Sequence, residues 1–248
     1  GYEDTNDAER LSVDPVMRRI VGGRATEKTA ASTSQVGRFE TEVLVDSDNL
    51  AQLMDLSGRW IDQVRRRTTV NEIILDMDSS VSPTHGQQEG TAYNGHFECT
   101  CYHPLFCFNQ FGDLERALLR EGQVHSADDW RSVLEPVVSR YRGTKKRFFR
   151  GDAAFAKPEL YEFLEQEGYQ YAIRLPANDV LYREIGDLLP RPVGRPPKKP
   201  SIRYEVFLYR AESWNCYRRV VAKVEWHWDE LFPRVGFIVT NMDTAAED

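Results

Sequence analysis

The stretch that most constrains the fold is Glu72 to Asp78, where a short apolar run carries two carboxylates. The apolar members of the run are Ile73, Ile74, Leu75 and Met77. Bounded by polar segments, they predict a central strand that is buried on both faces. Because side chains on a strand alternate, Asp76 and Asp78 should point to the same side. Two like charges are costly to bury together, so the pair indicates either a divalent-cation site or two acids that simply leave the strand into the turn at Ser79.

A buried central strand needs a sizeable core around it. The chain has 248 residues and is 41 % hydrophobic, which suffices for one large domain or for one domain with appendages. No apolar run approaches ~18 residues and no charged-then-apolar leader occurs, so we predict no membrane span, no signal peptide and a cytoplasmic location. The first residue is Gly1, which indicates a fragment or a processed product.

The four cysteines, Cys99, Cys101, Cys107 and Cys216, are unevenly spaced, which favours reduced thiols over a disulfide framework. A zinc site among them has to be weighed, because most of the His and Cys residues gather between His85 and Cys107. The spacing Cys99-x-Cys101 is one residue short of the usual zinc knuckle, and no second pair follows. We therefore predict thiols packed in a pair of strands over 99–111, and no zinc.

Residues 1–70 predict a helical accessory region without catalytic chemistry. Ser47 or Asp48 can cap a helix whose apolar residues repeat at helical spacing, with a break near Gly58. A second helix is predicted over 126–141, opened by a capping box and kinked by a proline. The two residues of this capping box are Ser126 and Asp129, and the proline is Pro136.

A strand, a helix and a strand are predicted in turn over 147–152, 158–167 and 169–175, so the two strands should be parallel and joined by a right-handed crossover. Asp152 ends the first of these strands, where α/β sheets open their binding crevices. The alternative for Asp152 is a helix-capping or turn role. Two strands that both end in carboxylates are how a ribonuclease-H-like domain brings distant acids together, and two Mg²⁺ ions could then bridge them for phosphoryl chemistry.

The net charge of −7 speaks weakly against nucleic acid, but basic residues cluster in the middle of the chain. A locally basic face can bind phosphate backbones even on an acidic protein, and the alternative is solvated surface charge. The candidates for DNA binding are Lys145, Lys146, Arg147, Arg150, Arg191, Arg195, Lys198 and Lys199. The last of these lie in RPVGRPPKKP, which is either a loose minor-groove hook or a Pro-rich linker.

Three further strands are predicted over 204–209, 217–224 and 235–240, with several tryptophans among them. Trp214 and Trp226 are candidates for stacking on unpaired nucleotides, and the alternative is that they belong to the core.

Three long phrases resemble the DDE transposases of bacterial insertion sequences, in the group whose ribonuclease-H-like core is interrupted by a β-rich insertion. The phrases are LDMDSSVSPTHGQQEG, NGHFECTCYHPLF and FFRGDAAFAKPELYEFLEQEGYQYAIRLPAN. The resemblance implies cut-and-paste transposition of double-stranded DNA by a nucleoid-associated, homodimeric enzyme. It also implies Mg²⁺, with Mn²⁺ possible, held by an Asp, Asp, Glu triad. By position the first catalytic and metal-binding acid is Asp78, with Asp76 as its runner-up, and the second is Asp152.

The third acid of the triad has no counterpart that fits. In relatives it lies in a helix after the insertion, with the spacing Tyr, two residues, Arg, three residues, Glu, six residues, Lys. Glu184 has the right neighbours, but they are adjacent rather than spaced, and Glu247 has the wrong neighbours. The sequence therefore looks cut at both ends. We expect this chain to bind DNA without cleaving transposon ends, and a chain extended through the glutamate helix to cleave them.

The resulting prediction is an α/β fold, with a ribonuclease-H-like mixed sheet flanked by helices. Residues 1–70 form the helical region, 71–186 the first part of the core, 187–234 a basic linker with a β-rich insertion, and 235–248 a returning core strand. The predicted function is a Mg²⁺-dependent transposase with a two-metal mechanism. The alternatives are an inactive DNA-binding remnant and a metal-dependent nuclease.

Overall fold

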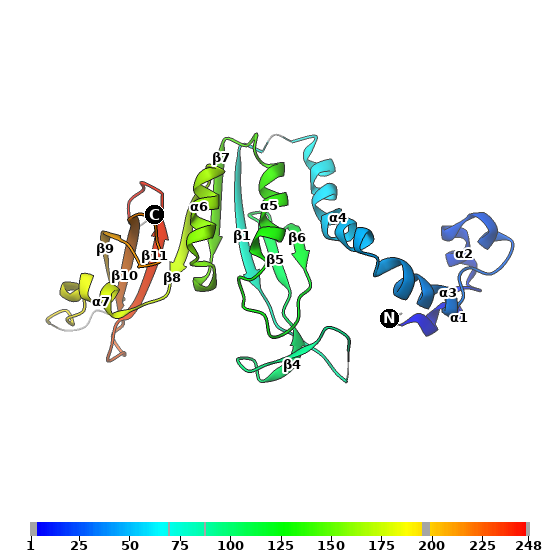
Figure 1. Cartoon of the computed structure of the whole chain (residues 1–248), viewed down its shortest axis with the longest axis horizontal. Helices are drawn as coiled ribbons and strands as arrows, with labels where there is room; N and C mark the ends of the chain where they lie inside the picture. Colours follow the sequence, from blue (N-terminus) through cyan, green and yellow to red (C-terminus); the bar gives the residue numbers. More distant parts are fainter. Residues whose placement is uncertain (1–3, 69, 87, 195–198, 247–248) are drawn as a thin grey trace. The chain divides into compact units, whose positions relative to one another are not determined.

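The computed structural model describes residues 4–68, 70–86, 88–194 and 199–246. The chain divides into two compact units, Gly1–Leu56 and Ser57–Asp248. The described residues of the first unit form the helical segments η1 (Thr5–Asp7), α1 (Ala8–Leu11), α2 (Pro15–Val21), η2 (Gly23–Thr26), α3 (Thr33–Arg38), η3 (Phe39–Leu44) and the first half of α4 (Ser47–Arg65) (Figure 1). No described helix combines the length and the hydropathy of a membrane span.

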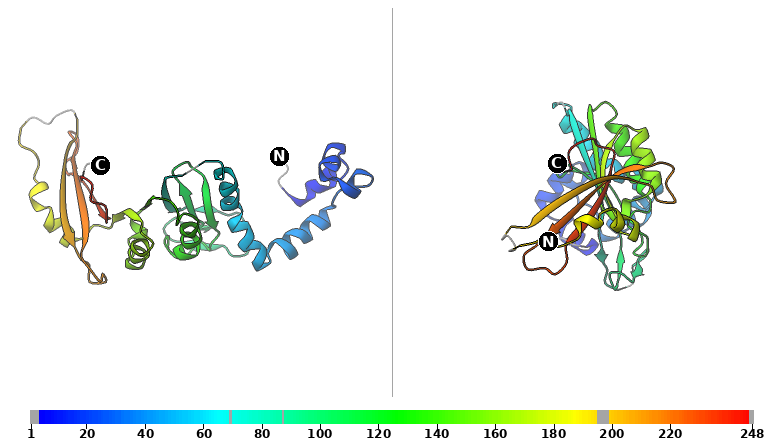
Figure 2. Two further views of the ribbon diagram at one scale, coloured as in Figure 1. Left: turned by 90° about the horizontal axis from the view of Figure 1, so that it is seen from above. Right: turned by 90° about the vertical axis from the view of Figure 1, so that its left-hand side faces the viewer.

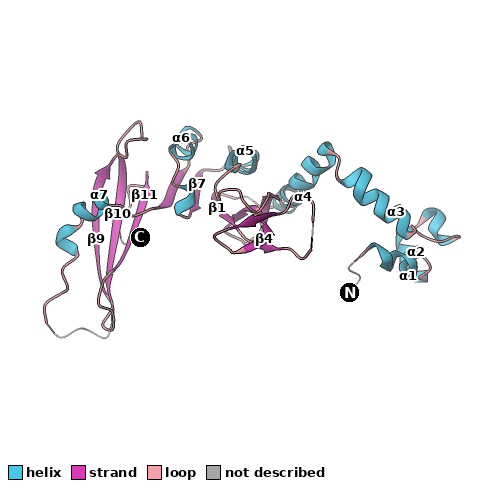
Figure 3. Ribbon diagram, turned by 60° about the horizontal axis from the view of Figure 1, so that its bottom comes forward, coloured by secondary structure: helices cyan, strands magenta, loops and turns pink. Residues whose placement is uncertain are grey.

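The second unit is built on an eight-stranded sheet in the order β6-β5-β1-β7-β8-β11-β10-β9, whose strands are labelled in Figure 1 and drawn in magenta in Figure 3. Its strands are β1 (Glu72–Ser79), β5 (Leu105–Asn109), β6 (Leu114–Leu118), β7 (Lys146–Gly151), β8 (Gln170–Leu175), β9 (Ser201–Tyr209), β10 (Arg218–Trp226) and β11 (Arg234–Thr240). β1 is antiparallel to β5 and parallel to β7, and β7 is parallel to β8. The predicted mixed α/β sheet is therefore confirmed, including the parallel pair that α6 (Pro158–Gln166) connects.

The three late strands were predicted correctly, and they continue the main sheet. β9, β10 and β11 are antiparallel neighbours, and β11 pairs with the edge of β8, so that Val239 lies opposite Ile173. α7 (Asp179–Glu184) and η5 (Gly186–Leu188) precede them.

The central strand β1 is buried on one face only, so the prediction of burial on both faces was wrong. Ile73, Leu75 and Met77 lie in the core, whereas on the other face Asp76 is half-buried and Asp78 is exposed. The physical reason is that α5 (Trp130–Arg140) and α6 lie on the same side of the sheet (Figure 2). The alternation of a strand then brings its apolar residues under the helices and leaves its acids on the open side.

A smaller sheet pairs β2 (Ser82–Pro83), β4 (Cys99–Tyr102) and β3 (Ala92–Asn94) in the order β2-β4-β3. Two strands form within the predicted range 99–111, β4 and β5, but they belong to different sheets and do not pair with each other. Cys101 and Cys107 are buried, and burial raises the pKa of both thiols. The absence of zinc stays a prediction, to be tested by metal analysis of the purified protein.

The helix α5 begins later than the capping box predicted. Its N-cap is Asp129, in the left-handed region at φ 56° and without a side-chain cap hydrogen bond. The backbone before it is held by the buried Arg120, whose guanidinium donates to the carbonyl oxygens of His125, Ser126 and Asp128. Because these carbonyl oxygens accept hydrogen bonds from Arg120, the segment before Asp129 forms a non-helical turn and does not extend α5. Pro136 lies inside α5.

The helix α4 runs without interruption through Gly58, so the predicted break was wrong. Gly58 is buried, and a Cβ built on it would overlap the guanidinium of Arg140. The absence of a side chain at Gly58 therefore allows Arg140 of α5 to pack against α4, and the glycine does not bend the helix. Most of the apolar residues predicted for this helix are exposed, and Ile61 is the one in the core.

Arg140 approaches α4 because it is held by Glu115, a carboxylate of β6 with no exposed surface. The same carboxylate accepts from the phenol of Tyr141 and, at 2.6 Å, from the amide of Asn109. Arg65 of α4 donates to the Tyr141 oxygen at 2.6 Å. Burial and then the Glu115 charge raise the pKa of Tyr141, so its hydroxyl remains a donor. These contacts form a buried polar network between α4, β6 and α5.

Gly58→Ala is expected to destabilise the protein by about 1–2 kcal/mol, although alanine favours helices by about 1 kcal/mol. The added methyl group displaces Arg140, and the buried Glu115 loses a charged hydrogen bond. Urea unfolding measures the effect. Gly143→Ala is the control, because nothing lies within 4 Å of its added Cβ; equal stability of the two variants would contradict the packing argument.

Candidate active site

Asp78 and Asp152 lie at the carboxyl ends of two neighbouring parallel strands. The register between β1 and β7 pairs Asp76 with Arg150 and Met77 with Gly151. Asp78 and Asp152 each follow the last paired residue, and Asp152 keeps an extended backbone, with φ −76° and ψ −173°. Since parallel strands are about 4.8 Å apart, this register brings the two acidic residues side by side.

Both carboxylates are exposed, and each is oriented by a nearby backbone N–H group. Oδ1 of Asp78 accepts from the Ser79 amide at 2.8 Å. Oδ1 of Asp152 accepts from the Ala154 amide at 3.0 Å, which caps the short turn η4 (Ala153–Phe155). Asp152 therefore has the capping role of the alternative prediction. Among the described residues, neither Oδ2 atom takes part in a hydrogen bond, so one oxygen of each acid can accept another partner.

Asp76 lies on the same face of β1, but its carboxylate is engaged. Both of its oxygens accept from the Arg150 guanidinium at 2.6 Å. This hydrogen bond raises the pKa of Arg150. A bidentate arginine competes with a cation for the same oxygens, so the pairing favours Asp78 over Asp76 as a metal ligand.

Two exposed carboxylates on one sheet edge are a donor set for a hard divalent cation. Mg²⁺ binds in proteins through one or two carboxylates and keeps several waters, and Asp78 with Asp152 fits that pattern. Within the described ranges no group of three or more His, Cys, Asp or Glu side chains is placed to hold a metal. Glu184 lies at the end of α7, and Glu247 lies outside the described residues.

The basic residues predicted for DNA binding, as far as the structure describes them, have different surroundings. Arg147 lies opposite Ile73 in the register, on the helix-covered face, with its guanidinium over the Tyr169 ring. Lys146 pairs with Glu72 at 3.6 Å, and Arg150 pairs with Asp76. Lys145, Arg191 and Lys199 are exposed. Arg195 and Lys198 lie outside the described residues.

Trp214 and Trp226 are only 6 % and 8 % exposed. The Trp214 ring contacts Tyr161 and Tyr209 edge to face, so both indoles fit the core alternative. The reason is the alternation of β10, which turns Trp226 inward together with its valines. Neither ring is accessible to a nucleotide base in this structure.

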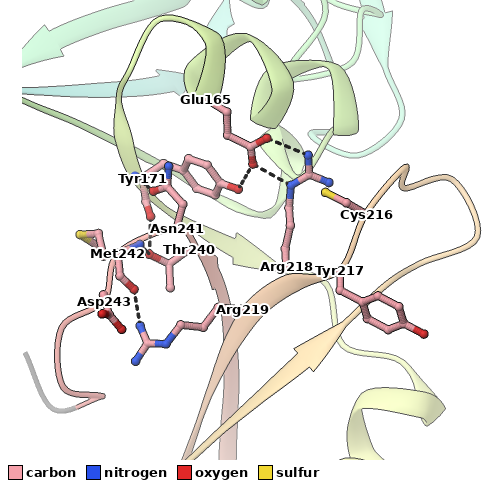
Figure 4. Close-up of a pocket in the computed structure, with 10 residues that line it drawn as sticks. All are labelled: Glu165, Tyr171, Cys216, Tyr217, Arg218, Arg219, Thr240, Asn241, Met242 and Asp243. Atoms are coloured by element: carbon pink, nitrogen blue, oxygen red, sulfur yellow. Dashed lines mark hydrogen bonds and ion pairs between the residues drawn. The ribbon is translucent and has the colours of Figure 1, made fainter.

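A separate pocket of about 360 Å³ lies between β10, β8 and the residues after β11 (Figure 4). Its polar groups largely satisfy one another: Glu165 accepts from Arg218 at 2.9 Å and from Tyr171 at 2.8 Å. Arg219 donates to the carbonyl oxygens of Met242 and Thr244. The pocket contains none of the acids at the ends of β1 and β7, and we do not place the chemistry there.

Sequence reasoning missed the side chain that contacts the end of β1. His103, buried between β4 and β5, has its Nε2 3.1 Å from Oγ of Ser79. The signal in the sequence was the polar CYHP segment immediately before a buried strand. Reasoning from local pattern could not place it, because its partner is 24 residues away.

Comparisons with known proteins point to one family. A family model described as transposase DDE domain group 1 matches residues 1–248. A comparison with curated proteins gives no match.

Among solved structures, the chain is similar to the Mos1 transposase paired-end complex with left transposon end, at 12 % identity and a TM-score of 0.28, over 68 % of this chain and 59 % of that one. It is also similar to a pre-cleavage Mos1 transpososome, at 11 % identity and a TM-score of 0.27, over 75 % of this chain and 66 % of that one. For the Marinitoga piezophila Argonaute in complex with 5′ OH guide RNA and target DNA, the identity is 8 % and the TM-score 0.28. That match covers 74 % of this chain and 25 % of the Argonaute chain. The chain thus spans less than two thirds of the Mos1 chains.

Proposed function

Because the chain belongs to the family of DDE transposases of domain group 1, we propose that it acts on the ends of a mobile DNA element through a cation held by Asp78 and Asp152. The observation that carries the proposal is the register of β1 and β7, which aligns the two acids at one sheet edge. When bound there, Mg²⁺ or Mn²⁺ supplies charge neutralisation at a phosphodiester and a lowered pKa for a coordinated water. The protein contributes the spacing of the two carboxylates and their orientation by backbone amides.

The roles proposed for the neighbouring charges follow from their contacts. Arg150 neutralises Asp76, so the local negative charge is carried by Asp78 and Asp152. The DNA surface is proposed to include the exposed Lys145, Arg191 and Lys199, with residues 1–70 as an accessory DNA-binding region. Double-stranded DNA and a second copy of this chain are the proposed partners.

A second candidate function is DNA binding without cleavage. It is favoured by the observation that, in the described part of the chain, no group of three or more His, Cys, Asp or Glu side chains is placed to hold a metal. In two-metal phosphoryl chemistry both ions flank the reacting phosphate, and two aspartates leave the second ion short of ligands.

The test is an assay on a labelled duplex that contains the DNA flanking the coding sequence, with Mg²⁺ or with EDTA. Mg²⁺-dependent nicking or joining that Asp152→Ala abolishes, with DNA binding unchanged, supports the enzyme. Binding without nicking supports the second candidate. A chain that is folded yet does not bind this duplex contradicts both.

DNA binding is expected to weaken with salt, and the exposed lysines should set part of the slope. Each phosphate contact by a lysine releases a counterion, so Lys145→Ala and Lys199→Ala should each reduce the slope of log affinity against log salt by about 0.9. Lys223→Ala is the control, because Lys223 is already paired with Glu225. Fluorescence anisotropy at several salt concentrations measures the slopes; unchanged slopes in both lysine variants would remove these residues from the DNA surface.

A further inference from the structure

The side chain of His103 links the end of β1 to the loop before α5. The residue is 3 % exposed. Its Nδ1 lies 3.0 Å from the Val124 carbonyl oxygen, and its Nε2 lies 3.1 Å from Oγ of Ser79. Ser79 follows Asp78 directly, and its backbone amide donates to Oδ1 of that aspartate. The buried imidazole therefore contacts the hydroxyl group of Ser79, the same residue whose backbone amide orients the Asp78 carboxylate.

The chemistry of the two partners determines the tautomer of the imidazole. A carbonyl oxygen can only accept, so Nδ1 must carry the hydrogen. In the neutral ring Nε2 then has a lone pair and accepts from the Ser79 hydroxyl. The serine rotamer is thereby specified, because its hydroxyl hydrogen must point at the ring.

A second set of contacts extends from His103 toward the strand that ends in Asp152. The Nε atom of Arg120 donates to the His103 carbonyl oxygen at 2.9 Å, and its Nη1 donates to that of Asp128 at 2.6 Å. The Asp128 carboxylate is paired with Lys157 at 3.2 Å. Lys157 is the N-cap residue of α6, five positions after Asp152. Hydrogen bonds and the backbone thus connect the segments that follow both acids.

Both ring nitrogens of His103 are occupied, which excludes two other roles in this conformation. A metal ligand needs a free nitrogen directed at the ion, and a general base needs one within reach of the substrate. His103 has neither, and its ring is covered on one side by the edge-to-face contact with Phe97.

We propose that His103 is a positioning residue for the two carboxylates that hold the cation, and that it acts through Ser79 on Asp78. The contacts of Arg120, Asp128 and Lys157 hold the segment that follows Asp152. The proposal rests on the proposed role of Asp78 and Asp152. Groups that orient a ligand from the second coordination sphere typically alter metal affinity 10- to 100-fold when removed. A merely structural histidine would alter stability and leave the affinity of the folded protein unchanged.

The test compares Ser79→Ala and Ser79→Thr in the full chain, with Ser80→Ala as the matched control. Ser79→Ala removes the hydroxyl that His103 orients and should weaken Mn²⁺ binding about 10-fold. Ser79→Thr keeps a hydroxyl donor and should restore most of the affinity. Ser80 is exposed, and Ser80→Ala should bind Mn²⁺ like the unchanged chain. Urea unfolding of each variant shows that affinities are compared between folded proteins.

A nitrogen-15 NMR spectrum of the histidines supplies a readout that needs no metal. His103 is expected in the Nδ1–H tautomer, with the Nε2 resonance shifting in Ser79→Ala. An Nε2–H tautomer in the unchanged chain, or equal Mn²⁺ affinity in Ser79→Ala and Ser80→Ala, overturns the positioning role alone. Failure of the unchanged chain to bind Mn²⁺ overturns the cation site itself, and with it both proposals.

Discussion

Asp78→Asn is expected to weaken Mn²⁺ binding about 100-fold, and Asp152→Asn is expected to do the same. Each substitution removes one of the two carboxylates proposed as ligands. The Coulomb attraction of a carboxylate for a divalent ion about 3 Å away is about 3 kcal/mol even at the dielectric constant of water. Since about 1.4 kcal/mol corresponds to a factor of ten, the loss of one ligand should be readily measurable.

Titration calorimetry with MnCl₂, and competition by MgCl₂, measures this loss. Asp76→Asn is the informative control, because the Asp76 carboxylate is held by Arg150 and should contribute little to the affinity. Asp187→Asn controls for net charge at an exposed position of η5. If Asp76→Asn weakened Mn²⁺ binding as much as Asp78→Asn, Asp76 would be a ligand, and Arg150 would have to move away from it when the ion binds.

Glu115→Ala is expected to destabilise the protein by about 3–5 kcal/mol, the usual cost of removing one partner from a buried ion pair. Glu115 has no exposed surface, and its loss leaves Arg140, Tyr141 and Asn109 without their common acceptor. The buried Tyr141 and Asn109 would each lose the acceptor of one donor, and the half-buried Arg140 would lose its carboxylate partner. The effect should be the largest of any single polar-to-alanine change proposed in this protein.

Urea unfolding followed by tryptophan fluorescence measures the loss. Glu115→Gln keeps the shape and much of the hydrogen bonding but removes the charge, so it should cost less than alanine. Asp62→Ala is the surface control: Asp62 lies 4.0 Å from Arg140 and is 46 % exposed, and exposed pairs contribute only about 0–1 kcal/mol. A cost for Glu115→Ala as small as for Asp62→Ala would show that the network contributes no stability.

Local pattern was sufficient wherever one element specifies itself. The apolar run before Asp78, the strand and helix around Pro158, and the alternation of the three late strands predicted β1, the β7-α6-β8 unit and β9 to β11. Family resemblance added the expectation that the ends of β1 and β7 form a site. The register that aligns Asp78 with Asp152 agrees with that expectation, and the two acids stay proposed ligands.

Local pattern failed where a distant partner decides. Gly58 looked like a helix break, because the guanidinium that fills the space beside it comes from α5. Ser126 looked like a cap, because the sequence does not show that Arg120 takes the carbonyls of that segment. For Trp214 and Trp226 the sequence left both DNA contact and burial in the core open, because their burial depends on strands and helices far along the chain.

The sequence by itself predicted β1, the β7-α6-β8 unit and β9 to β11, together with the acids at the ends of β1 and β7, because periodicity and chain connectivity are local properties. Only the tertiary structure decided that Arg150 pairs with Asp76, that Glu115 joins α4 to α5, and that His103 contacts Ser79. These pairs are separated by 74, 25 and 24 residues. Their formation depends on sheet order and side-chain packing, which set the distances between these side chains. The sequence gives the number and type of the charged residues but not those distances.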